Sequence, residues 1–112
     1  MDFKNYQSFR EAIEECSIKM IEAESVKALD VPYGGYFREG ENPFYSDGQI
    51  AYTITQISVE LYTSKDDVDS EKQFENWLNE NNISYHKFAR EWDSKNKWYV
   101  TFYEFELMFD GE

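Results

Sequence analysis

Basic residues are scarce in this sequence. Among its 112 residues, 11 are lysine or arginine and 23 are aspartate or glutamate, which gives a formal net charge of −12. Phosphate backbones and anionic membrane surfaces are bound mainly through lysine and arginine. The charge balance therefore disfavours ordinary nucleic-acid binding and binding to anionic membranes.

Cysteine is almost absent, and no long hydrophobic run occurs. The single cysteine, Cys16, has no second cysteine with which to form an internal disulfide. Met1 is followed by charged Asp2 and Lys4 rather than by an apolar signal segment, and no run is long enough to span a bilayer. These features predict a protein of the cytoplasm.

Motifs for catalysis and metal binding are missing as well. His86 is the only histidine, and the sequence has no nucleophile elbow and no paired cysteine ligands. Asp66, Asp67, Asp69 and Glu71 resemble a metal site, but they lack the glycine and final glutamate of a calcium loop, and helix N-termini commonly collect carboxylates. We expect no enzyme activity, no cofactor and no metal, and we expect His86 to be a surface strand residue.

Aromatic residues, by contrast, are abundant. They make up 19% of the chain, although the mean hydropathy is −0.77. The length favours one domain over residues 1–112 with a single core. Some of the large rings are expected to stay on the surface and to serve a partner.

The stretch with the clearest pattern is residues 49–63. It is dense in β-branched and aromatic side chains, and apolar positions alternate with polar ones, which predicts a long central strand. Strict alternation cannot place both Ile54 and Ile57 on one face of a sheet. The sequence therefore predicts a β-bulge or sharp twist near Thr55 and Gln56.

Two segments show helical spacing of apolar residues. Residues of about 5–27 form the first amphipathic pattern, in which Cys16 lies on the apolar stripe as a small buried side chain rather than a nucleophile. Residues of about 69–81 form the second, with Asp69 or Ser70 as the N-cap. Both segments are predicted to be helices.

The remaining segments predict further strands. Residues 29–37 indicate a short edge strand, and residues 38–48 indicate an exposed, turn-rich loop that carries Phe44 and Tyr45. Residues 83–109 alternate in two runs and predict a C-terminal hairpin with aromatic side chains on both faces of its second strand.

Together these elements predict an α+β fold. We expect a mainly antiparallel sheet of about four strands, with two helices packed on one face. The other face would be left with aromatic and charged side chains.

Several segments between roughly residues 45 and 107 resemble one protein family. The pattern resembles the tail-terminator proteins, also called tail-completion or head-tail joining proteins, of long-tailed phages and prophages of Gram-positive bacteria. Its most specific part is the strand ending Glu60-Leu61-Tyr62-Thr63 with Lys65-Asp66 behind it. The matching residues are Asp47-Gly48, Tyr52, Ile57-Ser58-Val59-Glu60-Leu61-Tyr62-Thr63, Lys65-Asp66, Glu71, Phe74-Glu75, Leu78, Ile83-Ser84-Tyr85-His86-Lys87 and Tyr103-Glu104-Phe105-Glu106.

The resemblance implies the fold of the lambda minor tail protein U class and a role in virion assembly. Such a protein forms a six-membered ring on the end of the tail tube, stops tube elongation and presents a surface to the head connector. Its partners would be other copies of itself, the tail-tube protein and the head connector protein. It would lie at the head-tail junction of the virion, and in the host cytoplasm during assembly.

Exposed rings are suited to such a ring contact. Phe44, Tyr45, Trp92 and Trp98 are the candidate subunit or partner interface residues, because aromatic anchors dominate contacts between subunits. Packing under a loop or across a hairpin is the competing interpretation for each of them. The acidic composition fits a lumen through which DNA passes without being bound.

Other function classes remain open. One is an acidic inhibitor or DNA mimic that binds a DNA-processing enzyme, although the carboxylates are interspersed with lysine and arginine along the sequence. Another is a neighbouring head-tail connector component of similar size. A small magnesium-dependent enzyme built on the acidic cluster after residue 65 ranks last.

Overall fold

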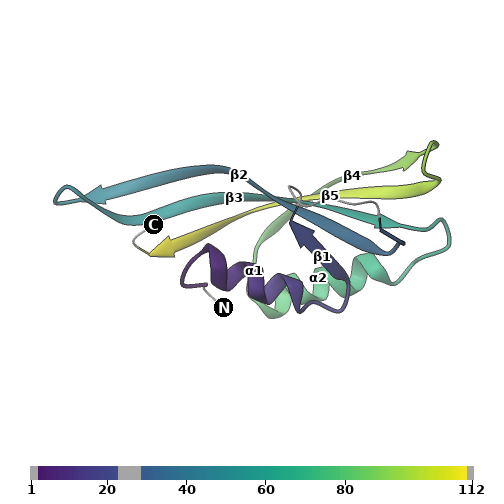
Figure 1. Cartoon of the computed structure of the whole chain (residues 1–112), viewed down its shortest axis with the longest axis horizontal. Helices are drawn as coiled ribbons and strands as arrows, with labels where there is room; N and C mark the ends of the chain where they lie inside the picture. The colour runs from purple at the N-terminus through teal and green to yellow at the C-terminus, as the bar shows by residue number, and fades with distance from the viewer. Residues whose placement is uncertain (1–2, 23–28, 111–112) are drawn as a thin grey trace.

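The chain folds into a five-stranded mixed sheet with two helices on one of its faces (Figure 1). The computed structural model describes residues 3–22 and 29–110. The elements in chain order are α1 (Tyr6–Glu14), β1 (Lys19–Glu22), β2 (Tyr33–Ser46), β3 (Gln49–Thr63), α2 (Ser70–Glu80), β4 (Tyr85–Asp93) and β5 (Trp98–Asp110). The strand order is β1-β2-β3-β5-β4, with β1 parallel to β2 and every other pair antiparallel. The predicted α+β class is therefore correct, and the predicted sheet of about four strands becomes a mixed sheet of five.

The core lies between the sheet and the two helices. Alternate residues of the two central strands point toward the helices, because side chains along a strand alternate between faces. They meet the buried faces of α1 and α2, on which Phe9, Ile13, Phe74 and Leu78 are fully buried. The buried sheet residues that complete this cluster include Tyr36, Ile57, Val59, Leu61, Tyr103, Phe105 and Phe109.

The central strand agrees with its predicted bounds, but the bulge predicted inside it is absent. Its pairing with β5 runs from Tyr52 to Thr63 without a shift. Ile57 faces the core and Ile54 faces the other side of the sheet, while the core-facing positions before Ile57 are the buried threonines Thr53 and Thr55. The alternation therefore stays unbroken because small polar residues fill part of the core face.

Bulges are present instead in the pairing of β2 with β3. Arg38 pairs with Ile57 while Gly40 pairs with Gln56, so Glu39 is the unpaired residue of a bulge in β2. A second shift follows the pair of Phe44 with Tyr52.

The first helix is shorter than its prediction over about 5–27. It ends at Glu14, and Lys19–Glu22 forms β1 beside β2. Met20 would be buried in a helix as well as in a strand. Residues four apart share one face of a helix and residues two apart share one face of a strand, so the burial pattern alone does not distinguish the two. Pairing with Tyr33–Tyr36 gives this segment its backbone partners, and residues 23–27 of the predicted helix lie outside the described residues.

The strand predicted over 29–37 is present from Tyr33 onward, but it is not an edge strand there, and the predicted loop over 38–48 is wrong. Strand β2 continues through this region to Ser46, and over Tyr33–Tyr36 it lies between β1 and β3. Beyond Tyr36 no described strand pairs with the other side of β2, so Pro43 lies where β2 is an edge strand, a position at which proline is tolerated. The hairpin turn consists of Asp47 and Gly48, whose φ angles of 52° and 79° are typical of a two-residue primed turn.

The second helix lies within its predicted range and Asp69 is its N-cap residue as predicted, but the capping hydrogen bonds are made by another side chain. Asp69 makes no side-chain capping bond, and Ser70 is the first helical residue. The Asp67 carboxylate accepts hydrogen bonds from the backbone N–H groups of Asp69 and Ser70, each at 3.0 Å. The C-terminal hairpin forms from β4 and β5, as predicted over 83–109.

The molecule is elongated, with extents of 53 × 26 × 22 Å. Among the described residues, β5 pairs with β3 only as far as Tyr52 opposite Asp110, so the end of the β2–β3 hairpin continues past the described part of the other strands. We call residues 44–51 the arm; it projects at the left of Figure 1. No helix among the described residues is long and apolar enough to cross a membrane.

Candidate interaction surfaces

The four predicted interface residues lie in two pairs at opposite ends of β3. Phe44 and Tyr45 belong to the arm, which adjoins Tyr52. Trp92 and Trp98 lie beside the β4–β5 turn, at the end where Thr63 pairs with Tyr99. The structure therefore does not gather them into one patch.

The arm exposes large apolar side chains. Phe44 stacks on Tyr52 with their ring centroids 4.8 Å apart, and 37% of its surface remains exposed. Tyr45 is 67% exposed, and Ile50 opposite it is exposed as well. A projecting hairpin with such residues has the properties of a contact element rather than of a core element.

At the other end the two tryptophans differ in environment. Trp92 packs edge-on against Tyr99 at 4.9 Å and stays 45% exposed, on the side of the sheet that carries the helices. Trp98 lies on the opposite side and is half-buried, with its ring 5.3 Å from that of Tyr62 and 5.8 Å from that of Tyr33. Packing across strands thus explains Trp98, whereas Trp92 is available for a contact.

The sheet face away from the helices, which we call the open face, is acidic and partly apolar. Cross-strand partners share a face, so the register assigns each described position to one side. The carboxylates on the open face are Glu60, Glu91, Asp93, Glu104, Glu106 and Asp110. On strands β2 to β5, none of the described positions that the register places on this face is a lysine or an arginine; Lys19 of the edge strand β1, which pairs with Tyr33, is the basic residue that the register adds. The basic residues Lys87 and Arg90 lie instead on the helix side of β4, where they pair with carboxylates of α2.

Three adjoining hollows cross the open face, with volumes of about 370, 410 and 290 Å³. The first and second share Phe88 and Glu104, and the second and third share Gln56 and Glu106. Because they share lining residues, they form one shallow channel, which we call the open-face groove. His86, predicted to be a surface strand residue, is exposed there beside Phe88, with ring centroids 4.3 Å apart.

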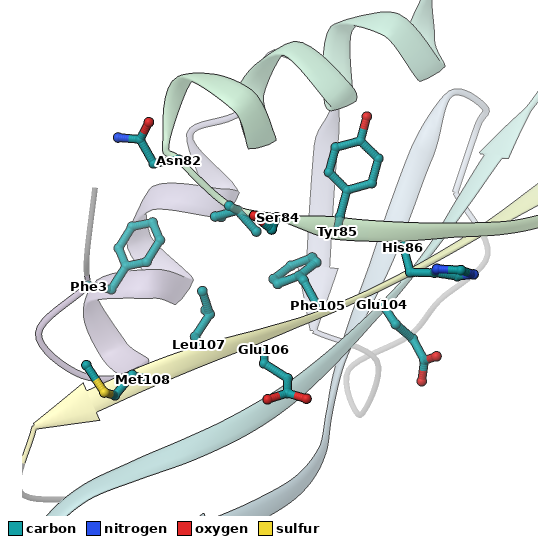
Figure 2. A pocket seen from close by; sticks show the side chains of 11 residues that line it. Phe3, Asn82, Ser84, Tyr85, His86, Glu104, Phe105, Glu106, Leu107 and Met108 are labelled. Atoms are coloured by element: carbon teal, nitrogen blue, oxygen red, sulfur yellow. The ribbon is translucent and has the colours of Figure 1, made fainter.

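A larger hollow of about 540 Å³ lies at the edge of β5 that faces β4, where β4 begins (Figure 2). Strand β4 begins at Tyr85 opposite Phe105, so among the described residues no strand pairs with the β4-facing edge of β5 beyond that point. Figure 2 shows Glu104 and Glu106 pointing to one side of β5 and Phe105 to the side of the helices. This hollow therefore combines a free strand edge with both faces of β5.

The acidic cluster beside α2 is used within the fold. Asp67 caps α2, and Glu71 forms ion pairs with Lys87 at 3.0 Å and with Arg90 at 3.1 Å. Within residues 3–22 and 29–110, no three histidine, cysteine, aspartate or glutamate side chains gather in a way that could hold a metal ion.

Tyrosine hydroxyls donate to carboxylates of both helices. Tyr103 Oη lies 2.7 Å from Glu75 Oε2, and burial together with this carboxylate raises the pKa of Tyr103 far above its usual value. On α1, Tyr36 donates to Glu14 in the same way. These contacts tie the helices to the sheet and place no nucleophile beside a base.

The open-face groove was missed by the sequence interpretation. Its signal was present in the alternation of Glu104 and Glu106 with buried Tyr103, Phe105 and Leu107, but only the pairing of β5 with β3 and β4 shows which carboxylates share a face. No protein-family model matches this chain, and a comparison with curated proteins finds no significant match.

Proposed function

We propose that this protein is a non-enzymatic assembly protein that caps a phage tail tube as a ring, stops its elongation and offers a surface for head joining. The proposal combines the resemblance of residues 45–107 to tail terminators with the distribution of exposed apolar side chains. Its subunits would meet in a head-to-tail contact, as closed rings require.

The single observation that carries the proposal is the separation of two different apolar ends on one elongated molecule. The arm exposes Tyr45 and Ile50, and the opposite end exposes Val68 and Trp92. A contact between two copies that uses different patches is heterologous, and it closes into a ring when the rotation between neighbours divides a full turn. In the proposed ring, the arm of one subunit packs on the opposite end of the next.

The charge of the molecule is compatible with a channel for DNA. The formal net charge is −12, and on strands β2 to β5 the open face carries carboxylates without lysine or arginine among its described positions. An acidic lumen would let DNA pass without being bound, because like charges repel.

The test is the solution mass across protein concentration, measured by light scattering after gel filtration, with and without purified tail-tube protein. The proposal expects a shift from 13.4 kDa to about six times that mass, alone or on the tube. A monomer or dimer at every concentration that never engages the tube contradicts it. A fixed one-to-one complex with a basic DNA-processing enzyme would instead favour the acidic inhibitor.

A matched pair of variants shows whether the arm makes the contact. Y45S/I50S removes two exposed apolar side chains from the arm, whereas M108S removes one that is 53% exposed on the open face. We expect the arm variant to remain monomeric and M108S to assemble normally. Equal loss of assembly in both would argue against the arm.

A further inference from the structure

The open-face groove has the properties of a docking site for a partner protein. We propose that it binds a segment of a partner that carries lysine or arginine side chains next to apolar ones. This inference does not depend on ring formation, because the groove lies on the sheet face and not on the arm.

The floor of the groove is apolar and accessible. Phe88 is 45% exposed, and Phe37 and Phe102 line the same hollow. Ile54 lines the far end of the groove, beyond Gln56. Apolar surface that continues across neighbouring strands is typical of a binding site, whereas single exposed apolar residues are common on any protein surface.

The charges along the groove select the partner. Glu60, Glu104 and Glu106 line it, and within the described part of the chain neither Glu104 nor Glu106 forms an ion pair. On the helix side, in contrast, Lys87 and Arg90 are already paired with Glu71. The groove therefore has carboxylates to offer to cations from another molecule.

Other occupants fit less well. A second copy would bring a net charge of −12 of its own, and nucleic acids or anionic membranes would bring phosphates. Like charges placed opposite each other are unfavourable in an interface. A small polyamine would satisfy the carboxylates but would leave Phe88 and Phe102 in water, so the apolar floor favours a peptide segment.

The experiment is an NMR titration of the ¹⁵N-labelled protein at low salt with a synthetic peptide in which lysine alternates with tryptophan and valine. We expect amide shifts to concentrate on the strands that line the groove, and we expect no binding by the same peptide with glutamate in place of every lysine. Shifts centred on the acidic start of α2 would overturn the proposal, as would the absence of binding at millimolar peptide.

Two charge-matched double variants separate the groove from the overall charge. E104Q/E106Q removes groove carboxylates, and D66N/E80Q removes two exposed carboxylates near and on α2. The first double variant should weaken peptide binding by about fivefold, which corresponds to the loss of two exposed ion pairs. The second should weaken it by less than about twofold.

F88A tests the apolar contribution, and spermidine tests the role of charge alone. The alanine variant should bind the peptide more weakly. Its fold should be unchanged, because Phe88 is an exposed strand residue. Two outcomes would overturn the proposal: equal weakening of peptide binding by both double variants, or complete displacement of the peptide by spermidine at the same concentration of positive charge. Either would show that the peptide is attracted by the overall negative charge of the protein rather than by the groove.

Discussion

The hydroxyl of Tyr103 donates a hydrogen bond to Glu75 Oε2 at 2.7 Å and thereby joins the middle of β5 to α2. Tyr103 is fully buried, so the variant Y103F keeps the ring packing but leaves the carboxylate without this donor. We expect Y103F to lower the free energy of unfolding by about 2 kcal/mol, as is usual for a hydrogen bond to a charged group.

Urea unfolding followed by circular dichroism measures this change. Y85F is the matched control, because Tyr85 donates to the same carboxylate over a longer distance of 3.4 Å and is more exposed. A cost for Y85F equal to that of Y103F would contradict the assignment of the bond.

The same carboxylate predicts a dependence of stability on pH. Burial alone would raise the pKa of Glu75, but hydrogen bonds from Lys87 and Tyr103 lower it below its usual value of 4.5. A lowered pKa in the folded state means that ionised Glu75 stabilises the fold above about pH 4.5 and that this contribution is lost as the pH falls through the folded pKa. Wild type should therefore exceed E75Q in stability at neutral pH, and the difference should shrink at about pH 3. Urea midpoints at both pH values test it, and a difference that grows in acid would refute it.

The cap of α2 predicts which of two neighbouring aspartates matters. Asp67 accepts hydrogen bonds from two backbone N–H groups at the start of the helix, whereas Asp69 makes no side-chain capping bond. We expect D67A to cost about 1 kcal/mol of stability and D69A less than about 0.5 kcal/mol. Thermal unfolding of the two variants measures both, and the reverse order would place the cap on Asp69.

Two adjacent glycines in β2 should respond differently to alanine. A Cβ added to Gly34 would lie 2.5 Å from Met20 Sδ and 3.3 Å from the backbone oxygen of Glu60, whereas at Gly35 the nearest atoms are 4.0 Å away. Because Met20 is buried against β2, we expect G34A to cost about 1 to 3 kcal/mol and G35A to be nearly neutral. Urea unfolding of both variants decides this, and equal stabilities would show that Met20 moves freely.

The Cys16 thiol should react slowly. Partial burial raises its pKa above its usual value of 9.0, so little thiolate is present at neutral pH. A chromogenic disulfide reagent should modify the folded protein more slowly than the protein in urea, and the rate should continue to rise above pH 9.0. A faster reaction in the folded state would indicate an activated cysteine.

Local signals were sufficient for three elements. The alternation over Gln49–Thr63, the apolar spacing of Phe74 and Leu78, and the two alternating runs of the C-terminal hairpin each correspond to an element of the structure. In each case the signal lies within the element itself or in the turn that joins its two strands, so periodicity and turn residues are enough.

Two elements were misassigned because pairing between distant segments decided them. Helical spacing continued past Glu14, but β1 forms because its backbone pairs with Tyr33–Tyr36. Polar residues made residues 38–48 resemble a loop, although the Asp47-Gly48 turn between two runs was a hairpin signal that could have been used. A bulge was expected near Thr55 and Gln56 of β3, but it lies in β2 at Glu39, opposite Gln56 and Ile57.

The sequence by itself determined the acidic charge, the central strand, the second helix and the absence of familiar catalytic motifs, because these depend on composition and short-range pattern. Only the tertiary structure decided that β2 extends into a projecting arm, that Trp92 is exposed while Trp98 is packed, and that carboxylates gather on one face beside Phe88. The physical reason is that strand register is a property of two segments at once. A single residue of shift moves every side chain of a strand to the other face.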